Sequence, residues 1–340
     1  MTYLPSAAHD LFARQHGVAS LDQLIGTGLT AGEIEHLSLR GALRSLVKGS
    51  YGSPSVQVTE QSMAAALCLA RPHVAVAGPS AGRLWGFRRL GSDRRLHVIA
   101  PPAAQPAGSS EVKVYRTAAI RPDDIIQRPD GIRLTTRQRT ALDLARSRPD
   151  DALLSIIEQA MHDGGLTGAD MRAVAAPWAR RRPWVRRYLR QLDRRVDGGA
   201  AESDPEVRVG VLLRDRGVRG LVRQFAVDLP GYGPARFDLA VPDVRWAVEV
   251  DVFPTHAETA GRASDVRRDR CAAADGWSVF RISAADYTHR LDARLDDAIH
   301  QYRSLRSTSA AMRIVRPLPD DAHRTGPGGS WDEDRPAATG

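Results

Sequence analysis

The sequence contains little lysine, little cysteine and no long apolar segment. Lys48 and Lys113 are its only lysines, so arginine carries almost all the positive charge of a 340-residue chain with a net charge of +8. The two cysteines, Cys68 and Cys271, lack metal-ligand spacing and are too few for a disulfide framework. No apolar run approaches the roughly 18–20 residues of a membrane-spanning helix, and the N-terminus has no signal pattern. We therefore expect a cytoplasmic protein without a membrane partner.

The positive charge is concentrated in one short segment. Residues 1–57 sum to zero, whereas residues 177–200 hold eight arginines against two aspartates. Such a cluster indicates either a phosphate-binding surface or a solvated helix face. A helix expected at 183–196 would bury its apolar face and turn three arginines away from it. Those three candidate DNA-binding residues are Arg187, Arg190 and Arg194.

Changes in residue pattern predict a multidomain α/β protein. Ser20 and Thr30 read as helix N-caps, and a turn at Lys48-Gly49 would join two short strands, as in a winged helix-turn-helix. Mixed helix and strand patterns follow, then a wholly helical stretch, and the chain ends in a segment rich in Pro, Gly and Asp. The expected segments are a winged helix-turn-helix at 1–57, an α+β middle domain at 58–150, a helical basic connector at 151–199, an α/β domain at 200–305 and a disordered tail at 306–340.

Three carboxylates lie in two apolar segments that read as strands, "FDLAVP" and "AVEVD". They are Asp238, Glu249 and Asp251, and the last two project from the same face because they are two residues apart. A buried carboxylate requires a pairing cation or a metal ion. Glu206, on a preceding helix, can reach the same point. Carboxylate oxygens are the ligands that Mg²⁺ prefers, so these residues are candidate magnesium ligands.

The C-terminal segment resembles the PD-(D/E)XK nuclease superfamily and, within it, actinobacterial domains related to very-short-patch-repair (Vsr) endonucleases. The matching motifs are "SDPEVRV", "VRQFAVDLPG", "ARFDLAVP", "AVEVDVFPTH" and "SDVRRDRCAAADGWSVFRI", which together cover residues 200–290. The resemblance implies a restriction-endonuclease-like α/β core. It implies a Mg²⁺-dependent DNA endonuclease with Asp238, Glu249 and Asp251 at the metal and Glu206 assisting.

The segment departs from the family pattern at one catalytic position. Asp251 occupies the place of the lysine that gives the superfamily its name, and Val252 and a single His256 replace the usual glycine and paired histidines. Arg268 or His256 would then have to stabilise the phosphate. Alternatively, Glu249 and Asp251 are satisfied by ion pairs with arginines, for which the candidates are Arg236, Arg268 and Arg270. His256 can equally be a structural hydrogen-bond donor.

Residues 8–57 resemble the N-terminal winged-helix domain of AbiEi-type antitoxins, the antitoxins of type IV toxin–antitoxin pairs. The matching stretches are "FARQHGVASLDQL" and "GLTAGEIEHLSLRGALRSLVKGSYG", and the resemblance continues weakly to about residue 160. It implies DNA binding through the helix at 31–40. Donors there and in the wing are Ser38, Arg40, Arg44 and Lys48. A winged helix used only for protein contacts is the alternative, since this module carries no net charge.

Two functions remain open from the sequence. The first is a DNA-binding protein of the toxin–antitoxin or defence type whose Vsr-like domain cleaves DNA with Mg²⁺. The second is a non-enzymatic, antitoxin-like transcriptional regulator whose nuclease fold is inactive and whose partners are DNA and a cognate toxin. The residues do not decide between them, nor do they indicate an oligomeric state.

Overall fold

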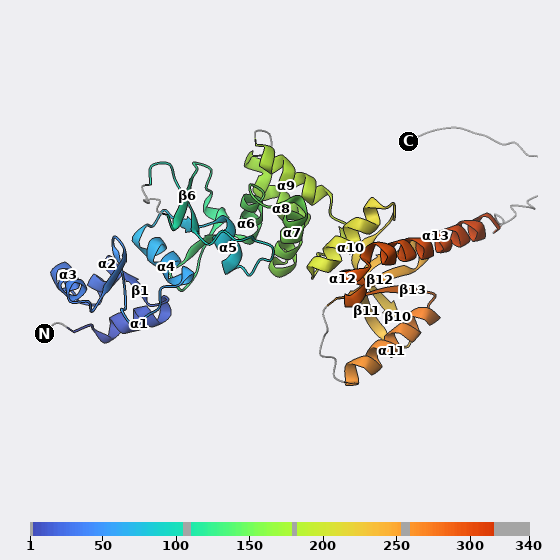
Figure 1. Cartoon of the computed structure of the whole chain (residues 1–340), viewed down its shortest axis with the longest axis horizontal. Helices are drawn as coiled ribbons and strands as arrows, with labels where there is room; N and C mark the ends of the chain where they lie inside the picture. The colour runs from blue at the N-terminus through green and yellow to red at the C-terminus, as the bar shows by residue number, and fades with distance from the viewer. Residues whose placement is uncertain (1–2, 105–109, 179–181, 253–258, 316–340) are drawn as a thin grey trace, which may run out of the picture.

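The structure, a computed structural model, describes residues 3–104, 110–178, 182–252 and 259–315. Its strands form three sheets, one of three strands and two of five. Helices accompany each sheet, and the groups of elements follow one another along the long axis of the molecule (Figure 1). The chain is therefore a multidomain protein of mixed α/β class. Within the described residues, no helix combines the length and apolar character needed to cross a membrane.

The first group of elements contains three helices and a small antiparallel sheet of order β1-β3-β2. Ser20 and Thr30 form capping boxes at the N-termini of α2 and α3, as the sequence predicts. The predicted turn joins β2 to β3, with Gly49 at a φ of 91°. The elements are α1 (Ser6–Arg14), β1 (Val18–Ser20), α2 (Leu21–Gly26), α3 (Ala31–Leu39), β2 (Arg44–Val47) and β3 (Ser50–Gly52).

The second group surrounds a five-stranded sheet of order β6-β5-β4-β8-β7. Alanines of α4 pack against apolar side chains of β4, β5 and β8 and form its core. The strands predicted at "RLHVIAP", "EVKVYRT" and "GIRLTT" are present as β5, β6 and β8. The elements are α4 (Glu60–Ala70), β4 (Ala75–Val76), α5 (Gly78–Leu84), β5 (Leu96–Ala100), β6 (Val112–Arg116), η1 (Pro122–Asp124), β7 (Ile125–Gln127), β8 (Arg133–Thr135) and α6 (Arg137–Leu144).

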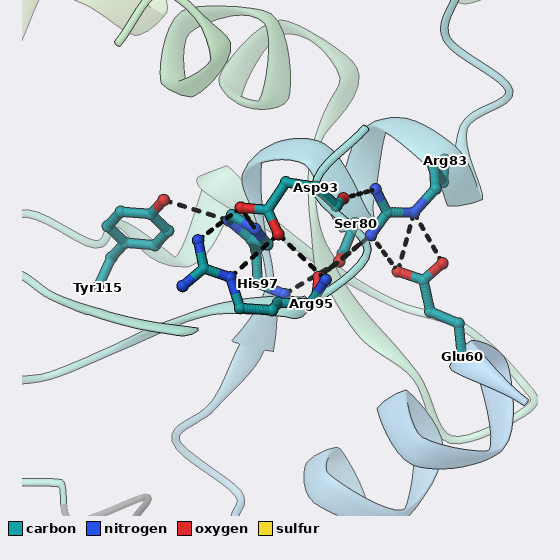
Figure 2. A network of polar contacts seen from close by, with 7 residues as sticks. All are labelled: Glu60, Ser80, Arg83, Asp93, Arg95, His97 and Tyr115. Carbon is teal, nitrogen blue, oxygen red and sulfur yellow. Dashed lines mark hydrogen bonds and ion pairs between the residues drawn. The ribbon is translucent and has the colours of Figure 1, made fainter. Parts of the chain in front are cut away.

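A polar network in this second group joins α4 and α5 to the strands (Figure 2). Arg83 on α5 donates to both carboxylate oxygens of Glu60 on α4, at 2.6 to 3.0 Å. His97 on β5 is 2% exposed, with its Nε2 3.1 Å from Asp93 and its Nδ1 3.2 Å from the Tyr115 hydroxyl. Burial lowers the pKa of His97. Because its charged groups are paired within the network, we assign the network to holding this sheet and its helices together.

Three helices follow, α7 (Asp150–Gly164), α8 (Gly168–Ala175) and α9 (Pro183–Asp193), with the short η2 (Ala176–Trp178) after α8. The sequence predicts the buried face of α9 correctly. Val185 and Leu192 are buried and Leu189 is partly buried against the same cluster. That cluster also includes Ile156 and Ile157 of α7, so α9 packs against α7 through its apolar face.

The third sheet has five strands in the order β13-β12-β11-β10-β9. β11 runs antiparallel to both β10 and β12. The outer strands are parallel to their neighbours, β13 to β12 and β9 to β10. α10 and α13 cover one face, where Trp246 and Val248 are buried, and α11 covers the other, where Phe237 and Trp277 are buried. The elements are β9 (Asp197–Gly198), α10 (Asp204–Asp215), β10 (Val222–Leu229), β11 (Gly233–Val241), η3 (Pro242–Val244), β12 (Trp246–Asp251), α11 (Thr259–Ala274), β13 (Ser278–Ser283), α12 (Ala284–His289) and α13 (Leu291–Val315).

The expected disordered tail at 306–340 is wrong at its start. Helix α13 continues through Val315, because Leu295, Ile299 and Tyr302 anchor it to the third sheet and the helix extends beyond those contacts. Residues 316–340 lie outside the described residues.

A buried ion cluster joins α7 to the third sheet. Glu158 of α7 and Arg223 of β10 form an ion pair, and both side chains are 0% exposed. Arg195 donates to the two oxygens of Glu158 at 2.9 and 3.2 Å, and the backbone N–H of Ala201 donates at 3.1 Å. Four donors therefore satisfy one carboxylate, which compensates its removal from water.

Gly210 on α10 makes room for this cluster. A Cβ at that position would lie 3.1 Å from Nη2 and 3.2 Å from Nε of Arg223. A glycine inside a helix costs about 1 kcal/mol relative to alanine. Here the missing side chain lets the buried guanidinium pass between α10 and the sheet.

We expect Glu158→Gln to destabilise the protein strongly. The substitution keeps the size of the side chain but leaves Arg195 and Arg223 without their anion, and breaking a buried pair typically costs about 3–5 kcal/mol. The midpoint of guanidinium-induced unfolding measures the loss. Asp163→Asn, on an exposed position of the same helix, is the control and should leave the midpoint unchanged. Equal midpoints for the two variants would contradict the role assigned to Glu158.

Candidate active site

Asp238 and Glu249 lie on neighbouring antiparallel strands. The register of β11 and β12 ends with Leu239 paired with Val248, and Asp238 and Glu249 are the next residues along the two strands. Directly opposite residues project from the same face of a sheet, with their Cβ atoms about 4.5–5.5 Å apart. An Oδ of Asp238 also accepts a hydrogen bond of 2.8 Å from the N–H of Val250. The two carboxylates therefore form a pair within the sheet.

Burial and nearby negative charge raise the pKa of both carboxyl groups. Desolvation is the main cause of a pKa of about 6 for Asp238, opposed by the Val250 hydrogen bond and reinforced by the charges of Glu206 and Asp251. Desolvation followed by the charge of Asp238 raises the pKa of Glu249 to about 7. Glu249 is 5% exposed. The pair thus shares negative charge that its surroundings compensate poorly.

Glu249 forms a long ion pair with Arg268 on α11. Its Nη2 lies 3.7 Å from Oε1 of Glu249, beyond hydrogen-bonding distance. That Oε1 is buried and has no hydrogen-bond partner within the described parts of the chain. Of the three arginines considered from the sequence, Arg236 pairs instead with Glu202, and Arg270 is exposed. Glu249 therefore keeps an unsatisfied oxygen.

Glu206 and Gln224 lie beside this pair. Ser203 caps α10 and accepts from the N–H of Glu206, which fixes the first turn of the helix. Oε2 of Glu206 accepts from the amide of Gln224 at 2.8 Å and from the N–H of Glu202 at 3.1 Å. Its charge contributes to raising the pKa of Asp238. Glu206 therefore acts on Asp238 through its charge, and it is not grouped with the pair as a third metal ligand within the described residues.

Gln224 has a strained backbone at the point where β10 faces Asp238. Its φ is +49°, although its neighbours in the strand pair regularly, Arg223 with Leu239 and Phe225 with Phe237. A left-handed non-glycine residue inside a strand costs about 1–3 kcal/mol, and such residues gather at functional sites. The strain directs the Gln224 side chain to Glu206.

Asp251 is engaged by an arginine. Its carboxylate accepts from Nη1 of Arg281 at 2.7 Å, and Arg281 also binds Asp269. Over the described residues, no three His, Cys, Asp or Glu side chains are grouped so as to hold a metal ion. The expected third ligand is therefore not grouped with Asp238 and Glu249. His256, the remaining catalytic candidate, lies outside the described residues.

Sequence reasoning did not identify Arg281 as the partner of Asp251. β13 runs parallel to β12 with Arg281 in register with Glu249, next to Asp251 along the strand edge. The signal was the alternating pattern of "SVFRIS", which indicates a strand. Only the strand order shows that this strand lies beside β12.

The expected DNA-binding residues fall into two groups. On α3 and the β2–β3 hairpin, Arg40, Arg44 and Lys48 are exposed, and Ser38 is half-buried. On α9 and just beyond it, Arg187 pairs with Asp150 and Arg194 with Asp215, so both are neutralised within the chain. The third residue of that set, Arg190, is exposed.

Comparisons with solved structures find a weak structural likeness. The crystal structure of the RV2827C protein from Mycobacterium tuberculosis is similar with a TM-score of 0.39 and 16% sequence identity, covering 57% of this chain and 78% of that one. No protein-family model matches the chain, and no curated protein matches it. A likeness this low bears on neither fold nor function, so the functional argument depends on the geometry of the chain itself.

The raised pKa of Glu249 predicts a stability that depends on pH. The folded-state pKa of about 7 exceeds the usual 4.5, so the folded state binds more protons between these values and wild-type stability falls as pH rises through them. Glu249→Gln removes the ionisable group, so its stability does not fall in this way as pH rises. Without divalent metal, we expect the variant to be more stable than wild type by about 3 kcal/mol at pH 8, and not below about pH 4.5.

Urea unfolding in EDTA at pH 4.5, 6 and 8 measures the difference. Asp228→Asn, at an exposed position of β10, is the control and should follow wild type at every pH. A stability difference between wild type and Glu249→Gln that stays constant with pH would contradict the shift.

Proposed function

We propose that the chain is a DNA-binding protein whose C-terminal domain is a metal-dependent endonuclease. The observation that carries the proposal is the Asp238–Glu249 pair. These carboxylates oppose each other on adjacent strands, share a buried face and have raised pKa values. Structural ion pairs neutralise their members, whereas this pair leaves an oxygen of Glu249 unsatisfied. Uncompensated carboxylates with perturbed pKa values are typical of catalytic sites.

The architecture around the pair supports a restriction-endonuclease-like fold of the PD-(D/E)XK type. A helix bearing Glu206 precedes three antiparallel strands, and a further strand runs parallel to the last of them after a crossover helix. The Vsr-like motifs of the sequence fall on these elements. Residues 200–305 are accordingly proposed as the nuclease-like domain, and residues 1–57 as an AbiEi-like winged helix that uses α3 and the hairpin to contact DNA.

The donor set of the pair fits a divalent ion such as Mg²⁺. Asp238 and Glu249 offer oxygen ligands, and the buried, unpartnered Oε1 of Glu249 is an acceptor without a donor. When bound there, the ion would polarise a phosphate and lower the pKa of a water molecule. Arg268 would offset the charge of the bound phosphate from the α11 side. Glu206, oriented by Gln224, would keep the negative potential at Asp238 high.

A non-enzymatic regulator is the second candidate, favoured by a specific contact. The superfamily places a lysine at the position of Asp251, and here that carboxylate is engaged by Arg281. A site without a cation at this position can bind DNA yet fail to stabilise the scissile phosphate. In that case the chain would act as an antitoxin-like DNA-binding protein, with a toxin as its protein partner.

We expect the wild type to cut plasmid DNA in the presence of Mg²⁺ or Mn²⁺. Asp238→Asn and Glu249→Gln should each reduce the rate by about 100-fold or more, because a metal supplies several kcal/mol of transition-state stabilisation. Agarose electrophoresis of supercoiled plasmid measures nicking and linearisation. Asp228→Asn is the matched control and should cut at the wild-type rate.

A wild type that retards DNA on a gel but never cuts it, with either metal, would replace the nuclease by the regulator. Cutting that survives both substitutions would place the activity elsewhere in the preparation and would refute the assigned site.

A further inference from the structure

Two tryptophans and several arginines gather where α6 meets α9. The rings of Trp178 and Trp184 lie 5.7 Å apart between centroids. The guanidinium of Arg146, just after α6, lies 4.1 Å from the centroid of Trp184, and that of Arg182 lies 5.8 Å from Trp178. Cation–π contacts of this kind hold planar guanidinium groups in defined positions while leaving their N–H donors available.

The arginines at this junction have no carboxylate partners. Five of them are exposed, and none forms an ion pair with a carboxylate in the described ranges. They are Arg116, Arg146, Arg182, Arg186 and Arg190. The nearby acids are already engaged, Asp143 by Arg139 and Asp150 by Arg187. The pKa of Arg146 is lowered by desolvation, and the charge of Arg182 adds to the shift. The charge of Asp143 opposes this shift, although Asp143 itself is paired with Arg139.

Four of these arginines line two hollows, and Arg187, which is paired with Asp150, also borders the first of them. A groove of about 370 Å³ is bordered by Trp184, Arg146, Arg186 and Arg190. A cavity of about 220 Å³ is bordered by Arg146 and Arg116, by the hydroxyl-bearing Thr117 and Ser147, and by Asp143, whose carboxylate is paired with Arg139. Arg146 lines both, so the groove and the cavity follow one another along a single basic track.

We propose that this track, the Arg–Trp surface formed by Arg116, Arg146, Arg182, Arg186, Arg190 and Trp184, binds the sugar–phosphate backbone of DNA. It rests on the proposed function only in naming DNA as the nucleic acid. Guanidinium groups bind phosphate oxygens through paired N–H donors, and each neutralised phosphate releases counterions. Of the helix face expected from the sequence, this surface keeps Arg190, because Arg187 and Arg194 are neutralised by aspartates.

The observations favour a nucleic acid over an acidic protein. The surface is an extended track, its cations are all arginines, and an aromatic ring lies among them. Grooves that follow a nucleic-acid backbone combine positive charge with aromatic side chains in this way. No lysine contributes, and arginine is the residue that matches the planar, bidentate geometry of phosphate.

The test compares two double variants by fluorescence anisotropy with a labelled 20-base-pair duplex. Arg186→Gln/Arg190→Gln removes two arginines of the track. Arg172→Gln/Arg194→Gln removes two arginines of the same helical segment that are paired with Asp193 and Asp215. All measurements are made in EDTA between 50 and 200 mM KCl, so that binding is read without cleavage. Tm values verify folding, and Arg186→Lys/Arg190→Lys tests whether charge restores binding.

We expect the track variant to lower the slope of log K against log salt by about 2, because each lost phosphate contact removes roughly 0.9. The control should keep the wild-type slope, and the lysine variant should recover most of it. A wild-type slope in the track variant, or an equal loss in the control, would overturn the proposal. So would displacement of the duplex by poly-glutamate at equal charge concentration, which would identify a surface for acidic proteins.

The outcome is separable from that of the proposed nuclease. Asp238→Asn should bind DNA with the wild-type slope whether or not the wild type cuts. A slope that depends on the track in a protein that never cuts would support the surface and refute the nuclease. Cutting by the wild type, together with an unchanged slope in the track variant, would support the nuclease and refute the surface.

Discussion

The joining of the helical segment to the third sheet depends on one buried carboxylate, that of Glu158. It holds Arg223 of β10 and Arg195 beyond α9, and it accepts from the backbone of Ala201 where the chain enters the C-terminal part. The carbonyl of Arg223 in turn accepts from the N–H of Gly199. Because buried charges tolerate few arrangements, this cluster fixes where β10 lies relative to α7.

The candidate site begins at Gln224, the residue after Arg223 on β10. Here negative charge is in excess, whereas positive charge is in excess around Glu158. Around Glu158, two arginines surround one carboxylate. Around Asp238 and Glu249, two carboxylates share one arginine that stays 3.7 Å away. Repulsion of this kind would disperse the carboxylates if their strands could move. The ladder of β11 and β12 and the clamped Arg223 prevent that, so the firmly paired cluster keeps the poorly compensated one in place.

Local patterns predicted much of this fold, and long-range pairing did not follow from them. The caps at Ser20 and Thr30, the β2–β3 turn and the buried face of α9 each depend on residues within one or two turns of chain. Strand alternation placed Glu249 and Asp251 on one face of the strand, whereas the approach of Asp238 to Glu249 was expected from the resemblance to a nuclease core. The partners of Glu158, Asp251 and Asp150 could not be found in that way, because each ion pair joins elements whose packing is decided by the tertiary fold. The extension of α13 to Val315 was not predicted for the same reason. Contacts with the third sheet anchor the first part of the helix, and its polar end continues from there.

The net charge of the chain is a poor guide to where a polyanion would bind. Many arginines serve within the fold: Arg139 and Arg223 are buried in ion pairs, Arg83 joins α4 to α5, and Arg187 joins α9 to the start of α7. A cation already paired with a carboxylate gains little by exchanging it for a phosphate, because both partners must be separated first.

What matters for binding a polyanion is therefore the set of cations left without an anion. Among the described residues, such cations include those on the small N-terminal sheet and beside α3, and those of the Arg–Trp surface at the α6–α9 junction. The second group lies between the N-terminal elements and the carboxylate pair in the order of the chain, and the Glu158 cluster connects its helices to the sheet that carries that pair. DNA bound to the Arg–Trp surface would thus lie on helices that the Glu158 cluster connects to the sheet of the candidate site.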